Sequence, residues 1–61
     1  MTIDNINPGK RFATPDGIEY VKVDGRVHAI SDGNDVDANA FELSSGKLRR
    51  VRGDVDLLLL K

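Results

Sequence analysis

The chain has 61 residues, no cysteine and one histidine, and its nine basic and ten acidic side chains leave a formal net charge of −1. A domain this short buries only about 60% of the surface that its unfolded chain exposes, so its core must be small. The composition excludes disulfides, argues against a closed zinc site, and does not mark the whole chain as a binder of nucleic acid or membrane.

The beginning of the chain carries no targeting signal. The first residues, MTIDNINPG, lack the basic and apolar regions of a signal peptide, and the longest apolar run is far shorter than the ~20 residues that cross a bilayer. Asn7-Pro8-Gly9 is a turn signal. We therefore expect residues 1–8 to be a flexible arm or a weak strand, and residues 9–61 to be a single small β domain in the cytoplasm.

Two turns and three apolar runs follow. Lys10–Thr14 is predicted to be a short strand that ends at the turn Pro15-Asp16-Gly17. The strongest structural signal is Ile18–Ile30, two apolar-rich runs separated by Asp24-Gly25, which is typical of a two-residue type I′ hairpin turn. Strict alternation of apolar and polar residues fails in these runs, so both faces are expected to be partly covered.

The second half of the chain continues the pattern of short strands. Ser31–Asp35 is predicted to be a loop. Ala38–Leu43 is favoured as a strand, with a single helical turn capped by Asp37 as the alternative. Lys47–Val51 and Val55–Leu60 are predicted to be the last two strands, separated by a glycine-containing turn.

These elements predict an all-β fold, a small SH3-like or related open barrel or β-meander of five to six short strands. The core is expected to come from the apolar residues of the predicted strands. These are Phe12, Tyr20, Val21, Val23, Val27, Ala29, Phe41, Leu43, Leu48, Val51, Val55 and Leu57.

The order of two motifs adds a family resemblance. The stretch DGIEYVKVDG is followed by NAFELSSGKLRRV and then by an apolar closing strand. This succession resembles small uncharacterised β-barrel accessory proteins of tailed bacteriophages, over residues 9–51. The resemblance implies a phage protein that acts in the bacterial host cell by binding a host or phage protein, with no catalytic residues shared by the family.

No set of residues indicates catalysis, a metal or a cofactor. A catalytic triad with His28 would have to assemble across strands, from one aspartate and Ser31, Ser44 or Ser45. Asp54 and Asp56 lack an apolar pocket that would raise a pKa. The acidic stretch DGNDVD, with Asp32, Asp35 and Asp37, lacks the ligand spacing of a calcium loop and is interpreted as a solvated turn. We therefore predict a protein that is not an enzyme and binds no cofactor or metal.

Basic residues concentrate near the end of the chain. Residues 47–61 carry five basic and two acidic side chains, whereas residues 1–46 carry four basic and eight acidic ones. The predicted binding residues are Lys47, Arg49, Arg50, Arg52 and Arg26. The expected partner is a protein, and the alternative is a nucleic acid bound by the basic strand 47–52. That alternative is weakened because a strand divides the cluster between two faces and the core alone needs the three aromatic residues.

The chain closes with four consecutive leucines, Leu57–Leu60. Side chains alternate between the faces of a strand, so a one-sided core covers only two of them. Leu58 and Leu60 are therefore the predicted self-association residues of a homodimer that forms through this strand. The alternative is that Ile3 and Ile6 fold over the same face within one chain.

Overall fold

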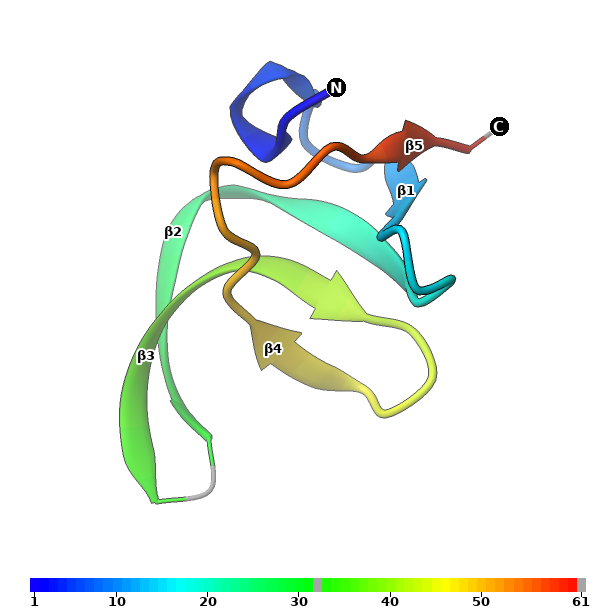
Figure 1. Ribbon diagram of the computed structural model, residues 1–61. Coiled ribbons are helices and arrows are strands. Elements are labelled where there is room, and N and C mark those ends of the chain that lie inside the picture. Colours follow the sequence, from blue (N-terminus) through cyan, green and yellow to red (C-terminus); the bar gives the residue numbers. More distant parts are fainter. Residues whose placement is uncertain (32, 61) are drawn as a thin grey trace.

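The computed structural model describes residues 1–31 and 33–60, which form an antiparallel five-stranded sheet (Figure 1). Its elements are the 3-10 turn η1 (Ile3–Asn5) and the strands β1 (Arg11–Ala13), β2 (Glu19–Ser31), β3 (Asn34–Glu42), β4 (Lys47–Arg49) and β5 (Leu58–Leu59). The order in the sheet is β4-β3-β2-β1-β5. The described strands β4 and β5 do not pair, so the chain is an all-β meander that is not closed into a barrel. No helix among these residues is long and apolar enough to cross a membrane.

The sheet bends at a bulge in β2. The first part of β2 pairs with β1 on one side and β3 on the other, and the last part pairs with β3 alone. The register shifts between Lys22 and Val27, where Gly25 has a φ of 67°. Residues with a side chain seldom adopt this conformation, so glycine allows the strand to bulge and change direction here.

The predicted hairpin turn at Asp24-Gly25 was therefore wrong. The runs on either side of this pair do not pair with each other, because both pair with β3 as parts of one continuous strand. The chain reverses later, where Ser31 pairs with Asn34. Ser31, Asn34 and Asp35 consequently belong to strands rather than to the predicted loop, and Asp32 of that loop lies outside the described residues.

Three of the other strand predictions agree with the structure. β1 lies within the predicted strand 10–14, and β4 lies within the predicted strand 47–51. Residues 38–42 are part of β3, so the strand was the correct choice over a helical turn. The closing strand is shorter than predicted, since only Leu58 and Leu59 pair with β1.

The core lies on one face of the sheet and is closed by the N-terminal segment. Its buried cluster consists of Ile3, Ile6, Phe12, Tyr20, Ala40, Val51 and Leu57, with Val55 packed against it. The rings of Phe12 and Tyr20 stack with their centroids 5.5 Å apart. Large side chains thus come from β1, β2, the segment before β1 and the segment between β4 and β5, while β3 contributes the small residues Ala38 and Ala40.

The predicted core was correct for Phe12, Tyr20, Val51 and Leu57 and wrong for several residues of the central strands. Val27 is 36% exposed and Leu43 is 43% exposed. Phe41 is only half-buried, because Ala40 faces the core and the next side chain along β3 points to the opposite face. The half-buried residues of the predicted core are Val21, Val23, Ala29, Phe41, Leu48 and Val55.

Residues 1–8 contain η1 and no strand. Ile3 and Ile6 are 1% and 3% exposed, and the backbone N–H of Leu57 donates to the carbonyl of Met1 at 2.6 Å. The two isoleucines therefore pack with Leu57 in the core cluster, whereas the one-chain alternative required them to cover the face that carries Leu58 and Leu60. Leu58 and Leu59 still remain exposed, at 67% and 45%.

Candidate functional site

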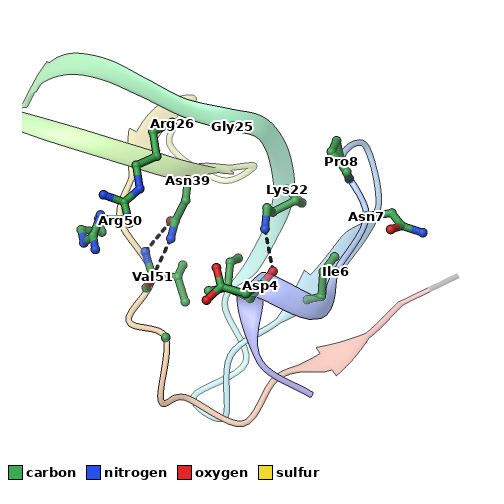
Figure 2. Close-up of a pocket in the computed structure, with 12 residues that line it drawn as sticks. Asp4, Ile6, Asn7, Pro8, Lys22, Gly25, Arg26, Asn39, Arg50 and Val51 are labelled. Carbon is green, nitrogen blue, oxygen red and sulfur yellow. Dashed lines mark hydrogen bonds between the residues drawn. The ribbon is translucent and has the colours of Figure 1, made fainter.

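A pocket of about 390 Å³ lies between η1, the bulge of β2 and the segment that follows β4 (Figure 2). Ile3, Ile6 and Val51 provide apolar wall, and all three belong to the core cluster. Polar and charged side chains come from η1, β2, β3 and residues 50–53. The pocket is therefore built by parts of the chain that lie far apart in the sequence.

The bulge of β2 supplies two of the charged residues. Lys22 precedes the register shift, Arg26 lies within it, and Gly25 lines the pocket between them. The Lys22 Nζ donates a hydrogen bond to the carbonyl oxygen of Ile3 at 2.6 Å, which ties β2 to η1 (Figure 2). The same contact holds an ammonium group at the wall of the pocket.

Asn39 of β3 positions the opposite wall. Its side-chain amide donates to the carbonyl of Val51 at 2.9 Å, and its side-chain oxygen accepts from the Val51 N–H at 2.7 Å (Figure 2). β4 has already ended at Arg49, so this side chain takes over where backbone pairing between β3 and β4 stops. These two hydrogen bonds, the Asn39 clamp, hold Val51 against β3 and thereby place the neighbouring Arg50 at the pocket.

The pocket has an excess of positive charge. Its charged lining residues are Lys22, Arg26, Arg50 and Asp4, which leaves three cations and one carboxylate, or a formal +2, in a chain of net charge −1. The Arg50 Nη1 donates to the backbone carbonyl of Asp37 at 3.4 Å. None of the three cations forms an ion pair within residues 1–31 and 33–60, and the side chain of Arg26 has no hydrogen bond there either.

Two of the five predicted binding residues, Arg26 and Arg50, lie together in this pocket (Figure 2). The other three do not line it. The Arg49 Nε lies 3.4 Å from a carboxylate oxygen of Glu42, and the Arg52 Nη2 lies 2.8 Å from Asp54. Lys47 is exposed on the edge strand β4. The basic cluster 47–52 is thus divided between internal ion pairs, the sheet edge and the pocket.

Sequence reasoning missed Lys22, Asp4 and Asn39 as parts of a site. Asn39 lies in the NAFEL motif, but nothing near it in the sequence indicates that its partner is the backbone of Val51. Lys22 occupies an apolar-rich run, where a lysine is ordinarily taken as the solvent-facing member of a strand. The only local signal that Lys22 belongs to a site was the presence of a lysine in an apolar-rich run.

Comparisons of the chain with protein-family models, with curated proteins and with solved structures found no match. The function is therefore inferred from the residues of the pocket and from their charges.

Proposed function

We propose that this protein is a small non-enzymatic binding module that holds an acidic segment of a protein partner in the pocket between η1, β2 and the segment after β4. The observation that carries the proposal is the uncompensated charge of Arg26 and Arg50, which both line the pocket without a carboxylate partner among the described residues. Guanidinium groups bind carboxylates through paired hydrogen bonds, so a glutamate or aspartate of a partner fits this site.

The pocket suits a peptide better than a nucleic acid. No aromatic side chain lines it in the described part of the chain, so these residues offer no platform on which a base could stack. Arg49 and Arg52 already face carboxylates of their own chain, so these two cations of the basic cluster 47–52 are not free to contact phosphates.

We assign the meander to the SH3-like open barrels. The strand order β4-β3-β2-β1-β5 and the long strand β2, which bends at Gly25 and takes part in pairing with both β1 and β3, support this assignment. A binding module of this kind also agrees with the resemblance to phage accessory proteins, for which we propose a role in the cytoplasm of the bacterial host.

Fluorescence anisotropy with a labelled glutamate-rich peptide tests the proposal. The peptide should bind at low salt, and the same peptide with glutamine in place of glutamate should not. Arg26→Gln and Arg50→Gln should each weaken binding by about fivefold, the effect of an exposed ion pair of ~1 kcal/mol. Arg52→Gln is the matched control, because Arg52 pairs with Asp54 and does not line the pocket.

Equal binding of the glutamate and glutamine peptides, or no loss in either pocket variant, would overturn the proposal. A labelled single-stranded oligonucleotide measured beside the peptide tests the alternative partner. Tighter binding of the oligonucleotide, with an affinity that falls steeply as salt rises, would instead favour a nucleic acid, because phosphate binding releases counterions.

A further inference from the structure

The outer half of the β2–β3 hairpin forms a ribbon that extends away from η1 and β5 (Figure 1). Beyond the bulge, residues 27–31 of β2 pair only with residues 34–38 of β3. A two-stranded ribbon without a covering layer is marginally stable in water. This part of the molecule therefore has the most to gain from contact with another surface.

One face of the ribbon is acidic. His28, Asp35 and Asp37 lie on it, because His28 is opposite Asp37 and Ile30 is opposite Asp35 in the pairing register. The side chains of Asp35 and Asp37 are 71% and 58% exposed. Their nearest basic group is His28, whose ring nitrogens lie 3.6 and 3.5 Å from them, and neither forms an ion pair with a lysine or arginine in the described part of the chain.

The same face carries an exposed apolar side chain. Ile30 is 74% exposed, the highest value among the large apolar residues that the structure describes. Two carboxylates that have no lysine or arginine partner among the described residues, next to an exposed isoleucine, complement a pocket with two guanidinium groups that have no carboxylate partner there. The ribbon and the pocket therefore match in charge.

We propose that the occupant of the pocket is the ribbon of a second copy of this chain, with Asp35 and Asp37 of one copy against Arg26 and Arg50 of the next. The inference rests on the proposed function, because it names the protein that supplies the acidic segment. A net charge of −1 leaves little repulsion between copies.

The ribbon cannot occupy the pocket of its own chain. Arg50 already contacts the backbone carbonyl of Asp37 in the same chain, so the pocket lies beside the inner part of the ribbon, whereas Ile30 and Asp35 pair farther along it. The pocket and the ribbon are different surfaces, and a contact between them joins copies head to tail. Such contacts produce a ring when the rotation closes and an open chain when it does not.

Light scattering of charge-reversed variants tests the inference. The wild-type mass should rise with protein concentration at low salt and fall when salt is added. Arg26→Glu/Arg50→Glu places acid against acid, and Asp35→Lys/Asp37→Lys places base against base, so each variant alone should stay monomeric. An equimolar mixture restores both contacts and should regain the wild-type mass.

Circular dichroism of each variant establishes that it is folded before the masses are compared. If a reversed variant does not fold, Arg26→Gln/Arg50→Gln and Asp35→Asn/Asp37→Asn replace it, and each should lower the wild-type mass. The control is Leu58→Glu, which alters the exposed closing strand and should leave self-association unchanged.

Three outcomes would overturn the inference. They are a wild-type monomer at all concentrations, a mixture of reversed variants that stays monomeric, and self-association that is lost in Leu58→Glu but kept in the charge variants. The last would place the contact at β5. If the wild type stays monomeric but binds the glutamate peptide through Arg26, the binding module stands and only its self-recognition is refuted.

Discussion

Asn39→Ala replaces one polar side chain, yet it should remove an unusually large part of the free energy of unfolding. The amide of Asn39 is hydrogen-bonded to both the N–H and the carbonyl of Val51, at 2.7 and 2.9 Å. Val51 is 6% exposed, so water cannot freely replace these partners. Alanine would leave a backbone donor and a backbone acceptor unpaired at the edge of the core.

The expected loss follows from the cost of unpaired groups. Each buried polar group without a partner costs ~1–3 kcal/mol, so two partly buried groups should cost about 2–4 kcal/mol. A domain of this length has a total free energy of unfolding of roughly 3–9 kcal/mol, at ~0.05–0.15 kcal/mol per residue. Asn39→Ala should therefore remove close to half of the stability and lower Tm by roughly 10 °C or more.

Urea denaturation followed by circular dichroism measures this loss. Asn39→Asp keeps the oxygen that accepts from the Val51 N–H and loses the donor, so it should fall between the wild type and Asn39→Ala. Asn7→Ala is the matched control, since Asn7 is exposed at the same pocket and only its backbone carbonyl makes a hydrogen bond. A loss below about 0.5 kcal/mol in Asn39→Ala would refute the clamp, because ordinary surface substitutions have effects of that size.

Three further predictions follow from the core, the bulge and a carboxyl group. Phe12→Ala should cost ~3–5 kcal/mol because Phe12 is fully buried, and Phe41→Ala on the half-buried face should cost clearly less; equal losses in Tm would contradict this division of the faces. Gly25→Ala should cost ~1–2 kcal/mol in urea denaturation because its φ is 67°, and an unchanged midpoint would show that the bulge tolerates a side chain. The pKa of Glu42 lies below its ordinary value, chiefly because of the hydroxyl of Ser45 and then because of Ser44 and Arg49. The folded state thus binds this proton less readily than the unfolded state, so the contribution of Glu42 to stability is full above its unfolded pKa and is lost as pH falls through its folded pKa. Glu42→Gln should flatten the acid side of the stability profile, and an unaltered profile would contradict this assignment.

The pattern of apolar runs and turn residues was enough to predict an all-β chain. Short runs between glycine-containing turns indicated β1 and β4 in the right places, and the shortness of the segment 38–43 favoured a strand over a helical turn. These signals are local, because strand propensity and the need for a positive φ depend on the residues themselves. These local signals therefore indicate a strand whichever neighbouring strand it finally pairs with.

The path of β2 depended on pairing instead. Gly25 needs a positive φ in a hairpin turn and in a bulge alike, so the residue pair Asp24-Gly25 is compatible with both. The bulge forms rather than the hairpin turn because β3 is long enough to pair with the residues on both sides of Gly25. The register of β3 also placed Ala40 in the core and Phe41 on the other face, although the larger residue would be expected inside.

The candidate site was decided almost entirely by tertiary structure. The sequence by itself determined which cations the chain possesses and included Arg26 and Arg50 among the predicted binding residues. It could not show which of them would find a carboxylate within the chain, because an ion pair needs two groups within a few ångströms. Folding brought Arg49 to Glu42 and Arg52 to Asp54, whereas the bulge of β2 and the clamp of Asn39 left Arg26 and Arg50 in one pocket without a carboxylate of their own among the described residues.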